Sequence, residues 1–349
     1  MAQVLNHLVL LSTPPQIEGF ELGGWATARY LPALTMGPLL QLRAEWNDLD
    51  QHQKTLLSDD FGMAVPTHLL MSALNLRTIA PTNYLLKHLN GLGHTLGGSV
   101  PKIGNLKTPD FIAFDNQGHL WVIECKGTMV SRSALRTRMR NEGVTQKNSL
   151  TISTPLVASG FLVVGLYIPQ SNHSQRPLCV VQDPPVRNSP GKVGAGENEW
   201  LGMEWAVRAN LASALHLMGL NEDGNALAMD MKLPSGMHRR LEEERRGEEE
   251  LPELLIEKTR FITRSRRYIF PNAVMTKDRR LDGLRLRVGV ANEVLEALEA
   301  GDAGTAVERA TARAKQAAWS TTTDAAGTSR LVLPSGVLLQ LDPIGPRVG

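Results

Sequence analysis

Apolar residues fall along the chain in short runs separated by polar residues, prolines and glycines, a pattern that predicts alternating helices and strands. Within residues 61–183, several runs rich in valine, isoleucine and phenylalanine are typical of buried strands. The predicted strands are 95–103, 110–114, 120–125, 161–168 and 178–182. The polar segment 131–150, between the third and fourth of these, is expected to be helical. A mixed central β-sheet flanked by helices, an α/β (α+β) arrangement, is therefore expected.

The same pattern predicts elements on either side of these strands. Residues 4–11 predict a strand, and residues 331–341 predict a terminal hairpin that turns at Pro334, Ser335 and Gly336. The predicted helices are 38–57, 66–76, 83–89, 200–220, 288–300 and 303–319.

Proline and glycine divide the chain into four zones. Residues 1–60 form an N-terminal extension, and residues 61–183 form the mixed α/β core. Residues 184–199 hold three prolines and three glycines, which is typical of a linker. Residues 200–349 are then expected to form a charged, mainly helical C-terminal domain.

Composition narrows the class of protein. A chain of 349 residues predicts two domains at about 150 residues each, and 42% hydrophobic with 21% charged residues is typical of globular proteins. The apolar runs fall short of the ~18 residues that a membrane span needs, and no basic segment precedes them as in a signal peptide. Two cysteines exclude a disulfide framework, so a reducing, cytoplasmic location without membrane partners is expected.

The most informative segment is 108–128, where two strand-like runs flank a turn at Asn116, Gln117 and Gly118. If the hairpin is symmetric about Gln117, Asp110 lies opposite Glu124, with Cβ atoms roughly 4.5–5.5 Å apart. Because side chains alternate along a strand, Lys126 shares the face of Glu124, and Cys125 points to the other face.

This arrangement brings two carboxylates and an ammonium group together. Opposed carboxylates repel each other and would destabilise a hairpin that has only a structural role. A divalent cation removes the repulsion, and hard oxygen ligands suit Mg²⁺. Such a cation can polarise a phosphate and generate a hydroxide, while Lys126 orients the attacking water or stabilises developing charge.

Pro109-Asp110 followed by Glu124-Cys125-Lys126 resembles the signature of the PD-(D/E)xK nuclease superfamily. The resemblance implies a restriction-endonuclease-like fold for residues 61–183 and metal-dependent hydrolysis of phosphodiester bonds, with DNA as the expected substrate. It implies that Asp110 and Glu124 bind Mg²⁺ or Mn²⁺, that the Cys125 carbonyl completes the metal shell, and that Lys126 is the catalytic lysine. It also implies a contribution from Gln146 and suggests a role in defence against foreign nucleic acid.

Some relatives carry a further acid on the helix that precedes the core. Residues 66–91 contain no Asp or Glu, so Glu45, or Asp59 and Asp60, would have to take that place.

Two readings compete with a nuclease. In the first, Asp110 caps a turn while Glu124 and Lys126 form an ordinary surface ion pair, worth about 0–1 kcal/mol. In the second, the chain is an inactive nuclease-like scaffold that binds nucleic acid or assembles in a larger complex. An enzyme that needs a partner or a signal for activity is a further alternative.

The net charge of +2 hides a segregation of charge along the chain. Residues 127–147 carry a net charge of +4, and residues 258–287 carry +8 with interleaved aromatics, offset by the acidic run 242–257. Basic segments of this kind can track phosphates, although a solvated helix face and core aromatics are equally ordinary explanations. The candidate nucleic-acid contacts are Lys107, Arg132, Arg136, Arg138, Arg140, Lys147, Arg264, Arg266 and Arg267. The charged C-terminal half is also a candidate surface for a protein partner or a second copy of the chain.

Overall fold

The computed structural model describes residues 2–16, 33–35, 39–48, 50–94, 108–153, 156, 158–183, 200–243, 253–275 and 280–346. The chain divides into two compact units. We call Gly37–Ala206 the central unit, and Met1–Met36 together with Val207–Gly349 the terminal unit. The expected boundary at residue 60 differs from this division, because the first 36 residues group with the C-terminal part of the chain.

The central unit is built on a mixed five-stranded sheet with the strand order β1-β3-β4-β6-β7. Its strands are β1 (Leu76–Pro81), β3 (Phe111–Asp115), β4 (Leu120–Thr128), β6 (Ala158–Tyr167) and β7 (Leu178–Gln182). β4 and β6 pair in parallel, and the other neighbours pair antiparallel. The parallel pair requires a crossover between β4 and β6, and the basic segment after β4 provides it.

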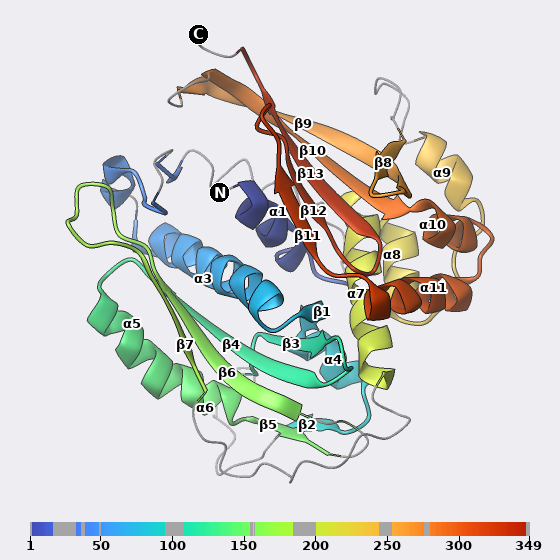
Figure 1. Cartoon of the computed structure of the whole chain (residues 1–349), viewed down its shortest axis with the longest axis horizontal. Helices are drawn as coiled ribbons and strands as arrows, with labels where there is room; N and C mark the ends of the chain where they lie inside the picture. The colour runs from blue at the N-terminus through green and yellow to red at the C-terminus, as the bar shows by residue number, and fades with distance from the viewer. Residues whose placement is uncertain are drawn as a thin grey trace. The chain divides into compact units, whose positions relative to one another are not determined.

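Helices cover both faces of this sheet (Figure 1). α3 (Gln51–Ala73) packs on one face against β4 and β6. The crossover segment packs on the other face as α5 (Arg132–Arg138), the π-helical turn η3 (Met139–Gly143) and α6 (Val144–Lys147). The smaller elements of this unit are η2 (Ala44–Asp48), α4 (Thr82–His88), β2 (Leu92–His94) and β5 (Leu150–Ile152).

Buried apolar residues hold these layers together. Leu135 and Met139 of the crossover segment pack on Val163 and Tyr167 of β6, and all four side chains are almost completely buried. The mixed α/β arrangement expected from the sequence is confirmed, including four of the five predicted strands and the helical crossover. The predicted strand 95–103 lies outside the described residues.

Two helix predictions for the central unit were wrong. α3 does not begin at Pro66 but runs through it from Gln51, and residues 76–81 form the edge strand β1. A proline removes one helical hydrogen bond and usually marks a helix start, so the pattern suggested a break that tertiary packing overrides. Residues 38–57 are likewise not one helix, because η2 and the start of α3 are separate elements.

The terminal unit contains a six-stranded antiparallel sheet with the order β11-β12-β13-β10-β9-β8. Its strands are β8 (Leu254–Ile256), β9 (Thr259–Met275), β10 (Arg280–Ala291), β11 (Ser320–Thr323), β12 (Ser329–Val332) and β13 (Val337–Ile344). Its helices are α1 (Ala2–Leu11), α8 (Asn221–Ala228), α9 (Met237–Glu243), α10 (Asn292–Glu299) and α11 (Ala303–Gln316). The boundary between the two units falls within α7 (Leu201–Leu217).

The expectation of a mainly helical C-terminal domain is therefore corrected. The basic segment 258–287 forms most of the β9–β10 hairpin, in which charged and apolar residues alternate along the strands. Residues 4–11 form α1 rather than a strand, and Asn6 Nδ2 donates to the Ser329 carbonyl at 3.0 Å. The predicted terminal hairpin is confirmed as β12–β13. No helix in the described part of the chain is both long enough and apolar enough to cross a bilayer.

Candidate metal centre

The β3–β4 hairpin has the register that its turn chemistry predicts. Phe111 pairs with Ile123 and Phe114 with Leu120, so the hairpin is symmetric about Gln117. Gly118 adopts a φ of 84°, a conformation that favours glycine. The Asp115 carboxylate accepts hydrogen bonds from the main-chain N–H groups of Gln117 and His119 and fixes the turn. The predicted register therefore needs no bulge.

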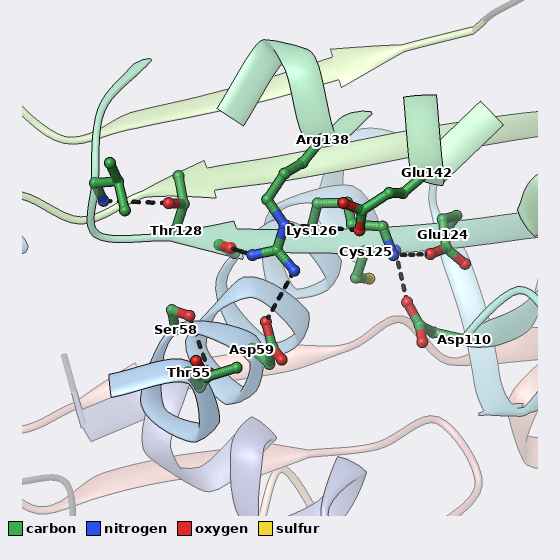
Figure 2. Close-up of polar contacts among 12 residues, drawn as sticks. Thr55, Ser58, Asp59, Asp110, Glu124, Cys125, Lys126, Thr128, Arg138 and Glu142 are labelled. Atoms are coloured by element: carbon green, nitrogen blue, oxygen red, sulfur yellow. Dashed lines mark hydrogen bonds and ion pairs between the residues drawn. The ribbon is translucent and has the colours of Figure 1, made fainter. Parts of the chain in front are cut away.

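This register brings Asp110 to the second strand beside Glu124. Asp110 directly precedes β3, and its Oδ2 accepts a hydrogen bond from the Cys125 N–H at 2.7 Å. Figure 2 shows the Glu124 carboxylate in contact with the Lys126 ammonium and the Asp110 carboxylate in contact with the adjacent Cys125 N–H. The Cys125 side chain is buried on the α3 side of the strand, and burial raises the pKa of its thiol. Its side chain therefore points to the opposite face of the strand from the side chains of Glu124 and Lys126.

Glu124 is completely buried, and its two carboxylate oxygens differ. Oε1 accepts a hydrogen bond from Lys126 Nζ. Oε2 is buried and accepts no hydrogen bond from the described residues. A buried carboxylate oxygen without a partner is costly, and such an atom needs an explanation such as an ion.

Lys126 links this carboxylate to the crossover segment. Its Nζ also donates to Gln146 Oε1 of α6 at 2.5 Å. Gln146 therefore lies at the site and orients the lysine. The sequence indicated this residue only through the resemblance to the nuclease motif. Gly143 of η3 brings this segment close: an added Cβ would lie 2.5 Å from Val163 and 3.7 Å from Glu124 Cγ. π-helical turns inside helices are frequent at functional sites.

Burial dominates the electrostatics of the two acids. Burial and the negative charge of Asp110 together raise the pKa of Glu124 to about 8, against the opposing effects of Lys126 and of the Asp110 main-chain N–H. Burial also raises the pKa of Asp110, against the hydrogen bond from Cys125. Each effect disfavours two bare carboxylates side by side, so a proton or a cation is needed between them.

A third acid, Asp59, approaches from the other face of the sheet. It lies on α3, which packs so closely on β4 that a Cβ at Gly127 would fall 1.6 Å from the Ser58 carbonyl oxygen. Burial raises the pKa of Asp59, while Arg138 and Lys126 lower it. Among the acids upstream of the hairpin, Asp59 is therefore the one that faces the site. Gly127, directly after the lysine, is the sequence feature that indicates the close packing of α3 on β4.

Arg138 bridges the two faces at the end of β4. Its Nη1 donates to the Gly127 carbonyl, its Nη2 lies 3.7 Å from Asp59, and its Nε lies 3.8 Å from Glu142 (Figure 2). The sequence suggested Arg138 only as a phosphate contact. The structure also gives it a role in holding α5 and α3 at the site.

The donor set fits a hard divalent cation. Mg²⁺ is usually held by one or two carboxylates plus waters, and Asp110 and Glu124 supply two carboxylates with an oxygen that is unsatisfied. No group of three or more His, Cys, Asp or Glu side chains in the described ranges has an arrangement that could hold a metal. A complete protein cage, as in a structural zinc site, is therefore not what these residues build.

The candidate phosphate contacts of the central unit separate into exposed and engaged groups. Arg136 and Arg140 are exposed on the crossover segment. Arg132 donates to the Arg176 carbonyl at 2.8 Å. Lys147 is a correction: it is fully buried, with its ammonium 5.7 Å from the centre of the Phe161 ring, so it does not present its charge to a phosphate.

The remaining candidates lie in the terminal unit, apart from Lys107, which is outside the described residues. Arg264 is also corrected, because it is buried and donates to the Met218 carbonyl. Arg266 is half-buried and Arg267 is exposed on β9. Phe261 is fully buried, so this aromatic belongs to the core rather than to a stacking surface.

Comparisons of the chain with protein-family models, with curated proteins and with solved structures gave no match.

Proposed function

We propose that this protein is a metal-dependent nuclease whose central unit is a restriction-endonuclease-like core of the PD-(D/E)xK type. One observation carries the proposal: the hairpin brings Asp110, Glu124 and Lys126 together, and Glu124 Oε2 is buried without a hydrogen bond from any described residue. A plain structural ion pair does not require a second buried carboxylate beside it. The preference for DNA and the role in defence follow from the resemblance of the motif.

In this proposal, each residue has a distinct task. Asp110 and Glu124 hold the cation, which when bound supplies Lewis-acid stabilisation of the phosphate and lowers the pKa of a water. Lys126 keeps its ammonium beside the attacking water and the developing negative charge. Gln146 is a positioning residue, because it touches Lys126 rather than the substrate. The water oxygen bonds to phosphorus, the bond to one bridging oxygen breaks, and the leaving oxygen takes a proton.

The first experiment is a cleavage panel of single- and double-stranded DNA and RNA with Mg²⁺, Mn²⁺ or EDTA. We expect metal-dependent cleavage that Glu124→Gln and Lys126→Met each reduce by about 100–1,000-fold or more. Glu204→Gln and Lys87→Met change the same residue types at exposed positions of the central unit and should retain wild-type activity. Circular dichroism and thermal melting establish that all four variants are folded. Equal cleavage by the wild type and both site variants would refute the proposal.

An inactive scaffold is the second candidate. It is favoured by the mutual engagement of Lys126 and Glu124 and by the lack of a third ligand in the described ranges. This alternative predicts nucleic-acid binding in EDTA that metals do not convert to cleavage, and binding that Glu124→Gln leaves unchanged.

A further inference from the structure

A second feature of the central unit lies at the end of β4, beyond Lys126. It is a half-open pocket of about 380 Å³. The residues that line it are Gln51, Lys54, Thr55, Ser58, Thr128, Met129, Val130, Ala134, Arg138, Gln170 and His173. They come from the first turns of α3, from the end of β4 and from α5, together with two residues that follow β6.

The lining of this pocket is cationic. Lys54, Arg138 and His173 contribute basic groups, and Thr128 contributes a hydroxyl, whereas the hydroxyls of Thr55 and Ser58 donate to main-chain carbonyls of α3. None of the lining residues is acidic. Among the described residues, no carboxylate forms an ion pair with the Lys54 ammonium. Arg138 already pairs with Asp59 and Glu142, so Lys54 and His173 are the basic groups that favour an anion in this concave site. Phosphate accepts both charge-assisted and hydroxyl hydrogen bonds.

The position of the pocket relates it to the site. Thr128 follows Lys126 by two residues on the same strand and has the same side-chain parity as Glu124 and Lys126. Two residues of strand span about 6.6 Å, and successive phosphates of one nucleic-acid strand are separated by about 3.4 Å along the helix axis. The pocket is therefore one or two nucleotides from the position where Lys126 would meet the scissile phosphate.

We propose that this pocket binds a phosphate group of the substrate strand, one or two nucleotides from the scissile phosphate. This inference rests on the proposed function, and it assigns Lys54 as the principal phosphate contact outside the catalytic group. The phosphate can belong to an internal phosphodiester or to a strand terminus. Both present the same phosphate oxygens to the pocket. Oligonucleotides that differ only at their ends distinguish an internal phosphodiester from a terminal phosphate.

The test measures binding without cleavage. In EDTA, fluorescence anisotropy would compare 12-nucleotide DNAs with a 5′-phosphate, a 3′-phosphate or two hydroxyl ends, as single strands and as duplexes. We expect Lys54→Met to weaken binding about 10-fold, because a charge-assisted contact to phosphate is lost. The slope of log K against log salt concentration should become shallower by about 0.7 for a single strand. Inorganic phosphate should compete with the wild type more strongly than with the variant.

Two further variants make the result specific. Lys54→Arg keeps the charge and should restore binding to within about threefold of the wild type. Lys87→Met removes a charge from an exposed lysine on α4 that does not line the pocket, and it should bind as the wild type does. Thermal melting of each variant establishes that the fold is kept.

The outcomes separate the pocket from the proposed function. A loss confined to one end-phosphorylated DNA supports a terminal phosphate, and an equal loss for all supports an internal one. No loss in any DNA, or an equal loss in Lys87→Met, overturns the pocket. Retained cleavage by Glu124→Gln overturns the proposed function, whereas the binding result in EDTA still decides the pocket.

Discussion

Glu124 is the residue on which the proposed chemistry depends most. Its carboxylate is completely buried, one oxygen contacts the lysine, and the other has no hydrogen-bond partner in the described part of the chain. Burial raises its pKa to about 8, so near neutral pH the metal-free carboxyl is largely protonated. A cation that binds here must displace that proton, and the group therefore couples metal binding to pH.

The first prediction concerns stability against pH in the metal-free protein. A glutamate ionises near pH 4.5 when unperturbed and near pH 8 here, so between these values the folded state binds more protons than the unfolded chain. The free energy of unfolding contributed by Glu124 is therefore fully present below pH 4.5 and is lost as pH rises through 8. The expected slope is at most about 1.4 kcal/mol per pH unit.

Urea unfolding in EDTA at pH 5, 6, 7 and 8 measures this slope. Glu124→Gln should make the free energy of unfolding less dependent on pH, and Glu204→Gln, at an exposed position, should not. A wild-type protein that gains stability over this range, relative to Glu124→Gln, would contradict the assigned titration.

Asp59 gives a second prediction at the residue scale. It faces the site from α3 and interacts electrostatically with Lys126 and Asp110. We expect Asp59→Asn to reduce metal-dependent cleavage by about 10–100-fold, as is usual for groups that support metal ligands. The loss should be partly restored by a higher metal concentration. Asp60→Asn makes the same change one residue along α3 and serves as the control; equal effects of the two would remove the assignment to Asp59.

The close packing of α3 on β4 carries a prediction at the element scale. Gly127 and Gly62 meet at this contact, and a Cβ at Gly127 would fall 1.6 Å from a main-chain oxygen. Overpacking typically costs about 1–3 kcal/mol, and a clash with backbone belongs at the upper end of that range. Gly127→Ala should therefore lower the melting temperature and, by moving α3, also reduce cleavage.

Gly304→Ala is the matched control for this substitution. Gly304 lies in the first turn of α11, where the nearest atom to an added Cβ is an Asp302 carboxylate oxygen at 3.5 Å. Alanine should be neutral or slightly stabilising there. A Gly127→Ala protein as stable as the control would show that α3 can move away at little cost.

The elements that the sequence predicts well are those determined by neighbouring residues, such as turn residues and the alternation of side chains along a strand. The β3–β4 hairpin and its register follow from the turn at Asn116, Gln117 and Gly118 and from the alternation on either side. That register alone brings Asp110 to Glu124. The third acid could not be located in this way, because Asp59 approaches through tertiary packing of α3 rather than through local pairing.

The incorrect elements share a physical cause. The apolar run in α1 is short and almost continuous, so periodicity does not distinguish a buried helix from a buried strand. In β9, arginines such as Arg264 look like a phosphate-binding face, but burial within the terminal unit engages them. Pro66 suggests a helix start, yet the rest of α3 outweighs one missing hydrogen bond.

At the scale of the whole molecule, charge separates into two kinds of basic segment. Several arginines of the β9–β10 region are paired inside the terminal unit, as with Arg287 and Asp342 at 2.9 Å and Arg260 and Glu253 at 3.2 Å. In the central unit, Arg136 and Arg140 are exposed. The net charge of +2 is therefore a poor guide, and we expect phosphate binding to depend mainly on the central unit.

The division into units gives the last prediction. All of the proposed catalytic groups, the two helical layers that cover their sheet and the cationic pocket belong to residues 37–206. We expect this segment, expressed alone, to unfold cooperatively and to retain metal-dependent cleavage within about tenfold of the full chain, because the central unit has its own core.

Removal of residues 1–16 from the full chain is the complementary change. It deletes α1, whose Leu5, Leu8 and Val9 are buried and whose Asn6 donates to the terminal-unit sheet. Loss of several buried aliphatic side chains costs about 2–5 kcal/mol each, so the terminal unit should unfold. Cleavage should survive, because none of the proposed catalytic residues lies in the terminal unit. If the truncated chain loses cleavage while residues 37–206 alone retain it, an unfolded terminal unit inhibits the site. If both lose cleavage, catalysis needs the whole chain.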